Sequence, residues 1–68
     1  MNDETFNHSL RKFLKMVGVS SQTEIEKAVG QALAEKRIAG TEALPATMTL
    51  EIAGVGLKVT FDGKIELE

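Results

Sequence analysis

The sequence predicts a small α+β domain of two layers, with its elements in the order helix, helix, strand, strand, strand (ααβββ). Apolar residues recur at three- and four-residue spacing through residues 3–39, which is typical of amphipathic helices. From Thr47 onward apolar and polar residues alternate, which is typical of half-buried strands. We therefore expect a single domain over residues 1–68, in which an N-terminal helical hairpin packs on one face of a three-stranded antiparallel meander.

The first helix is expected over residues 3–17. Asn2 or Asp3 can cap its start, and Gly18 can adopt the left-handed conformation that ends a helix. Its apolar stripe has the spacing i, i+4, i+7, i+8, i+11 and consists of Phe6, Leu10, Phe13, Leu14 and Val17.

The second helix is expected over residues 21–39. Ser21 and Glu24 have the spacing of a capping box, and Ser20 is an equally usable N-cap. Gly40 is expected to end the helix. Because so few residues separate the two helices, they are expected to form an αα-hairpin. The second apolar stripe consists of Ile25, Ala28, Val29, Ala32 and Leu33.

Three strands are expected after a linker at residues 41–46, over residues 47–52, 57–61 and 64–68. The segment AGVG (53–56) fits a type II′ turn with Gly54 and Val55 at its centre, which places Ile52 opposite Leu57.

The reversal between the second and third strands is expected at Asp62-Gly63. A two-residue turn there would put apolar and charged residues on one face. A three-residue loop, Phe61-Asp62-Gly63, with Gly63 left-handed at a bulge, restores the alternation. Lys58 then lies between Glu51 and Glu66 on the outer face.

The composition excludes several classes of protein. The chain has 68 residues, no cysteine, one histidine and a net charge of −2. These features make a structural zinc site or a disulfide scaffold untenable, and the expectation is that no metal and no cofactor is bound. The N-terminus is acidic and no long apolar stretch is present, so a cytoplasmic protein without membrane contact is expected.

The sequence offers no catalytic set, so we expect that the protein is not an enzyme. His8 is the only histidine and has Glu4 as the only carboxylate within one helical turn. Ser20 and Ser21 have the roles of capping residues.

A basic stripe is a candidate interaction surface. It runs along the polar face of the first helix at i, i+3, i+4 and i+7 and consists of His8, Arg11, Lys12 and Lys15. Such a stripe can attract a phosphate backbone or an acidic protein, but it is also what any amphipathic helix needs as a solvated face. Three cations would support only weak, salt-sensitive nucleic-acid binding, which is the alternative function.

The first strand supplies a second candidate surface, because its edge exposes backbone groups to a partner. Its outward residues are Thr47, Thr49 and Glu51. Strand 64–68 is protected by its charged residues. The leading expectation is a protein-interaction module that binds an unknown protein partner or a second copy of itself.

Two segments, FNHSLRKFLKMVGVSSQTEIEKAV and LPATMTLEIAGVGLKVTFDGKIELE, together resemble a small family of uncharacterised bacterial proteins. The members are stand-alone chains of about this length that form a domain of unknown function. The resemblance covers nearly the entire chain. It implies a free-standing cytoplasmic domain and supplies no activity and no functional residues.

Overall fold

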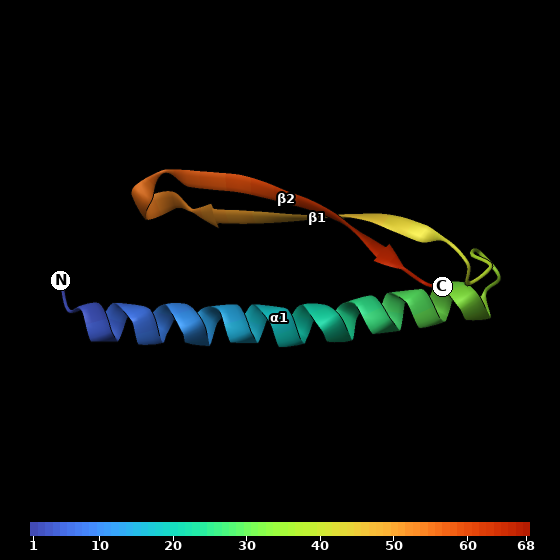
Figure 1. The fold of residues 1–68 in the computed structure, drawn as a ribbon, viewed down its shortest axis with the longest axis horizontal. Helices are drawn as coiled ribbons and strands as arrows, with labels where there is room; N and C mark the ends of the chain where they lie inside the picture. The colour runs from blue at the N-terminus through green and yellow to red at the C-terminus, as the bar shows by residue number, and fades with distance from the viewer. The chain divides into compact units, whose positions relative to one another are not determined.

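The computed structural model describes all 68 residues. The chain divides into two compact units, residues 1–35 and residues 36–68. The first unit is one helix, α1 (Asp3–Ala34), and the second is a hairpin of β1 (Ala43–Ile52) and β2 (Leu57–Glu66) joined by a short 3₁₀ turn, η1 (Ala53–Val55) (Figure 1). The predicted two-layer ααβββ fold is therefore wrong, because neither the helical hairpin nor the three-stranded meander forms.

The start of α1 is as the sequence predicts. Asn2 is the N-cap, and its side-chain oxygen accepts a hydrogen bond from the Thr5 N–H at 3.0 Å. Asp3 and Glu4 occupy the first turn, where negative charge interacts favourably with the helix dipole.

The helix continues through Gly18, where the sequence predicts its end. Only Gly40, Gly56 and Lys36 have a positive φ, so Gly18 keeps a helical backbone. The two predicted apolar stripes lie in phase along one helix, because Val17, Ser21 and Ile25 follow one another at four-residue spacing. This continuity outweighs the cost of about 1 kcal/mol for an interior glycine. Ser20 and Ser21 therefore lie inside α1 and cap nothing.

The helix ends at Ala34, earlier than the predicted end before Gly40. The Glu35 N–H still donates to the Gln31 carbonyl oxygen at 2.9 Å, and the chain then turns through Lys36, whose φ is 59°. A left-handed residue directly after the last turn is a common way to end a helix, although glycine is the usual choice.

The predicted register of the first hairpin is confirmed. β1 and β2 form a two-stranded antiparallel sheet in which Ile52 lies opposite Leu57 and Glu51 lies opposite Lys58. The connecting turn differs from the prediction, because the left-handed residue is Gly56 (φ 64°) and Gly54 is not left-handed. The Gly56 N–H closes the turn by donating to the Ala53 carbonyl oxygen at 3.1 Å.

The predicted second reversal does not occur. Asp62 and Gly63 lie inside β2, opposite Thr47 and Ala46, so residues 64–66 continue the same strand. Residues 43–46, expected in a linker, are part of β1. In a continuous strand Phe61, Gly63 and Ile65 all lie on one face without any bulge. The chain therefore keeps its apolar residues together without reversing at Asp62-Gly63.

Candidate functional site

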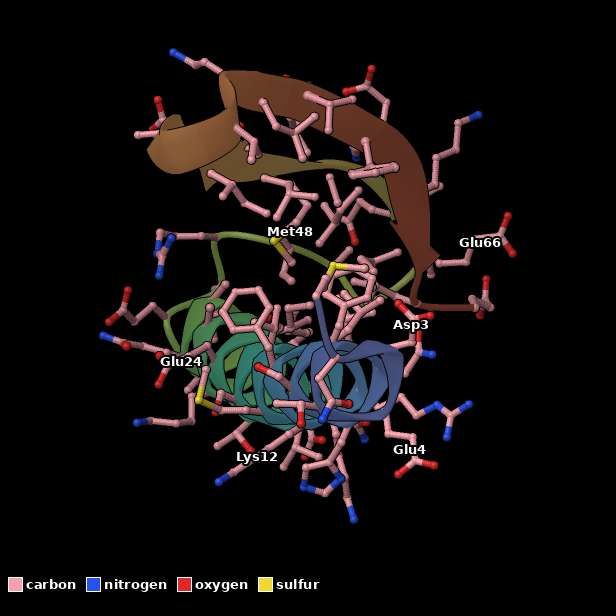
Figure 2. The ribbon with its side chains drawn as sticks, turned by 90° about the vertical axis from the view of Figure 1, so that its left-hand side faces the viewer. Asp3, Glu4, Lys12, Glu24, Met48 and Glu66 are labelled. Atoms are coloured by element: carbon pink, nitrogen blue, oxygen red, sulfur yellow. The ribbon has the colours of Figure 1, made fainter.

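One face of the hairpin is entirely apolar. Successive side chains of a strand point to opposite faces, and directly paired residues share a face. One face, called the apolar face below, therefore consists of Leu44, Ala46, Met48, Leu50 and Ile52 from β1 and Leu57, Val59, Phe61, Gly63 and Ile65 from β2. Met48 on this face and Glu66 on the other project to opposite sides of the hairpin (Figure 2).

The apolar face is open to solvent over much of its area. Phe61 is 57% exposed, Ile52 46% and Met48 45%, whereas the one buried residue of the whole chain is Ala32 at 7%. A contiguous exposed apolar surface of this kind makes the apolar face a candidate interaction surface. Sequence reasoning assigned these side chains to an internal core, so it missed them as a surface. The uninterrupted alternation from Leu57 to Ile65, across Asp62-Gly63, was the signal that could have identified one continuous face.

The opposite face of the hairpin is polar and specifies the register. Thr47 donates its hydroxyl hydrogen bond to a carboxylate oxygen of Asp62 at 3.1 Å. Glu51 lies directly opposite Lys58, and such opposite-charge pairs contribute about 0.2–1 kcal/mol each.

Both strands present an open edge. The Leu67 N–H donates to the Glu42 carbonyl oxygen at 2.9 Å, which makes Glu42 and Leu67 a hydrogen-bonded pair. Hydrogen-bonded and non-hydrogen-bonded pairs alternate along an antiparallel ladder, so the backbone groups of Thr47, Thr49 and Glu51 point outward. Pro45 is compatible with this alternation, because a residue at its position does not donate an N–H to β2.

The predicted edge residues of β1 thus share one open edge, while β2 presents a second edge that is richer in charge. By the same alternation, the backbone groups of every second residue in β2 point away from β1. These residues are Lys58, Thr60, Asp62, Lys64 and Glu66.

The predicted basic stripe lies on the exposed surface of α1. His8, Arg11, Lys12 and Lys15 are all exposed, and Lys12 extends outward from the helix (Figure 2). None of these four residues forms an ion pair, whereas Lys27 pairs with Glu24 elsewhere on α1 at 3.8 Å. The four residues therefore form one continuous row on α1, and no other side chain of the helix pairs with them.

The carboxylate of Glu42 forms a compact hydrogen-bonded turn. It accepts hydrogen bonds from the N–H groups of Ala39 and Gly40, each at 2.8 Å, and of Thr41 at 3.0 Å. These bonds, the one from Ala39 foremost, lower the pKa of Glu42, because they stabilise the charged form. All of the partners belong to residues 39–42, so the arrangement orders the turn that leads into β1.

No group of three or more His, Cys, Asp or Glu side chains is placed to hold a metal ion. None of the helices has the length and apolar character needed to span a bilayer.

Comparison with known proteins returns one match. No curated protein and no solved structure matches the chain. The model of a family of unknown function, DUF6494, matches residues 1–68, which confirms the resemblance to an uncharacterised family seen in the sequence. Since that match covers the whole chain, the protein belongs to the family of unknown function DUF6494.

Proposed function

We propose that this protein is a non-enzymatic protein-interaction module whose binding surface is the apolar face of the β1–β2 hairpin. The observation that carries the proposal is that every residue of this face is apolar or glycine, while Ala32 is the only buried residue of the chain. A module that leaves its apolar residues uncovered gains stability when a partner covers them.

The expected gain is large enough to support specific binding. Covering a Val, Leu, Ile, Phe or Met side chain contributes about 1.5–3 kcal/mol relative to leaving it exposed. Phe61 and Met48, which lie directly opposite each other, are both about half exposed and supply adjacent anchors. A two-stranded hairpin is at best marginally stable alone, so a partner that adds a layer or a strand also stabilises the fold.

The side chains that could serve catalysis are poorly arranged for it, which supports the non-enzymatic part of the proposal. His8 is exposed on α1, where Glu4 is the only carboxylate within one turn of the helix. The Glu42 carboxylate is already engaged by three backbone N–H groups. An acid/base pair needs two groups whose environments are tuned together, and these residues do not supply one.

The test compares three tagged baits in a lysate at physiological salt. The first is wild type, the second is Val59→Lys on the apolar face, and the third is Thr60→Lys on the polar face as the matched control. We expect wild type and Thr60→Lys to retain the same partner and Val59→Lys to lose at least nine-tenths of it. Burying an unpaired lysine charge under a partner has a high desolvation cost. Circular dichroism verifies that each variant keeps its helix and strands. Equal capture by all three baits would overturn the proposal.

The alternative of weak nucleic-acid binding through the basic stripe stays a prediction. The same capture is repeated with nuclease and with a fourth bait carrying Arg11→Glu, Lys12→Glu and Lys15→Glu. A partner lost after nuclease treatment and absent from the fourth bait would favour the alternative. A partner retained under both conditions excludes it.

A further inference from the structure

We propose that a second copy of this chain pairs the outer edge of its β2 antiparallel to the outer edge of the first β2. The two-fold axis passes through Gly63, and the product is a four-stranded sheet in the order β1-β2-β2-β1. This inference goes beyond the proposed function, because it concerns the β2 edge of the hairpin and leaves the apolar face free for a partner.

The backbone of β2 is prepared for such pairing. By the alternation of the ladder, the N–H and C=O groups of Thr60, Asp62 and Lys64 point away from β1 and are left without a partner in the sheet. An edge with unpaired groups is a template for a further strand. Sheets become independently stable at three or more strands with one apolar face, which the two-stranded hairpin does not reach and the paired hairpins do.

The charges on the β2 edge favour the register centred on Gly63 over the two registers shifted by one residue. When the axis passes through Gly63, Asp62 of one copy lies opposite Lys64 of the other, and the symmetry repeats this pair. Thr60 lies opposite Glu66 in the same register. A shift that centres the axis on Asp62 or on Lys64 sets two like charges against each other, which is unfavourable.

The same register also joins the two apolar faces. Directly opposite residues share a face, so Phe61 of one copy lies opposite Ile65 of the other, and Gly63 lies opposite itself. An added Cβ at Gly63 would meet no atom of its own chain within 4 Å. The apolar faces of the two hairpins therefore form one continuous surface.

The β1 edge is a poorer match for itself. Its outward residues include Pro45, which has no N–H to donate, and its only charged side chain is Glu51. Self-pairing through β1 would have no opposite charge to set the register. The earlier prediction that Thr47, Thr49 and Glu51 bind a partner stays open for a protein other than a second copy.

The first experiment is disulfide trapping, which the chain allows because it has no cysteine. Gly63→Cys places a thiol opposite its own copy in a non-hydrogen-bonded pair, where the Cα atoms lie about 4.5 Å apart, within the range that a disulfide spans. Gly54→Cys, at the hairpin turn, is the matched control, since neither glycine has a positive φ or a neighbour that a Cβ would meet. We expect purified Gly63→Cys to form a disulfide dimer under mild oxidation at least tenfold faster than Gly54→Cys. Equal rates would overturn the register.

The second experiment exchanges charges and is read by analytical ultracentrifugation. Asp62→Lys and Lys64→Asp each place like charges opposite each other, so we expect each variant to dimerise at least tenfold more weakly than wild type. An equimolar mixture of the two restores opposite charges at both positions, and we expect it to dimerise like wild type. Recovery on mixing shows that the single variants are folded.

The outcomes separate the two proposals. If wild type stays monomeric up to 100-fold above the concentration used for capture, or if mixing the two variants does not restore dimers, the chain does not pair with itself. The proposed function then survives if Val59→Lys still loses its captured protein. If capture is unaffected by Val59→Lys while charge exchange behaves as expected, self-pairing stands and the apolar face is not the binding surface.

Discussion

The hydroxyl of Thr47 donates a hydrogen bond to the carboxylate of Asp62 at 3.1 Å, across the hairpin and on its polar face. The sequence predicts a chain reversal at this aspartate, because Asp-Gly is a strong turn signal. Here the aspartate is instead a paired strand residue, and the glycine after it lies opposite Ala46. The difference between a turn and a strand at this point can be measured, because the two place opposite demands on the glycine.

Gly63 and Gly56 should respond oppositely to the same substitution. Gly63→Ala is expected to raise the free energy of unfolding by about 0.4–1 kcal/mol, since it restricts the unfolded chain without strain in a strand. Gly56→Ala, at φ 64°, is expected to lower it by about 1 kcal/mol or more. Urea denaturation followed by circular dichroism measures both. Destabilisation by Gly63→Ala would mean that Gly63 needs the left-handed turn conformation.

Gly18 should tolerate a side chain well. In the interior of α1 an added Cβ meets no atom within 4 Å, so Gly18→Ala is expected to stabilise the protein by about 0.8–1 kcal/mol. The substitution should also increase the helical signal at 222 nm. Two helices with a left-handed Gly18 between them would instead lose stability. Gly30→Ala, a second interior glycine of the same helix, is the control and should behave in the same way.

Replacing Lys36 with glycine should stabilise the protein. Its φ of 59° costs a residue with a Cβ about 1–2 kcal/mol. Glycine avoids this cost but loses more conformational freedom on folding, which offsets part of the gain. Lys36→Gly is therefore expected to raise the free energy of unfolding by about 0.5–1 kcal/mol. Lys12→Gly, on the exposed surface inside α1, should lower it by about 0.5–1 kcal/mol. Thermal unfolding of the pair should show shifts of opposite sign.

Glu42 should make the turn before β1 sensitive to acid. The hydrogen bonds from the Ala39 and Gly40 N–H groups hold the pKa of Glu42 below its ordinary value in the folded chain. The stability that they contribute is therefore present above the unfolded-state pKa and is lost as the pH falls through the lower folded-state pKa.

The measurement for Glu42 is an NMR titration of the Ala39 and Gly40 amide signals. We expect both signals to titrate together with a midpoint below that of an ordinary glutamate, and we expect Glu42→Gln to abolish the transition. In denaturation experiments the free energy of unfolding of wild type should exceed that of Glu42→Gln at neutral pH, and this difference should disappear on acidification. A midpoint at or above the ordinary value would contradict the hydrogen-bonded turn.

Proline substitution should reveal the hydrogen-bond phase of β1. The Thr49 N–H points outward, so Thr49→Pro removes no ladder bond and should leave a folded hairpin, as Pro45 already does. Leu50→Pro removes a ladder donor and should abolish the strand signal. Amide exchange in the two variants distinguishes them. If Thr49→Pro also releases the captured partner while the hairpin persists, the β1 edge is a binding site.

The parts of the fold predicted correctly rest on signals that only one structure satisfies. Asn2, one of the two predicted caps, accepts a hydrogen bond from the otherwise free Thr5 N–H at the start of α1. A turn centred in AGVG, together with the alternation on both sides of it, predicted the pairing of Ile52 with Leu57.

The errors arose where a local signal competed with a longer pattern. Gly18 and Ser21 resemble a helix end and a helix start, but the four-residue spacing through Ser21 extends one stripe along a single helix. Asp62-Gly63 resembles a turn, but the alternation continues across it. In both cases the structure follows the longer pattern. The open apolar face was not predictable from residue types, because a core and a binding surface are made from the same side chains.

The position of Pro45 limits how far these hairpins can assemble. A sheet that recruits strands through both edges can grow without end into a fibre, and short apolar strands are prone to this. In this protein one edge carries alternating charges, while the other is interrupted by a residue that cannot donate. If the hairpins pair through β2 as proposed, further growth through β1 is disfavoured at Pro45, which removes one of the N–H groups that an added strand would need.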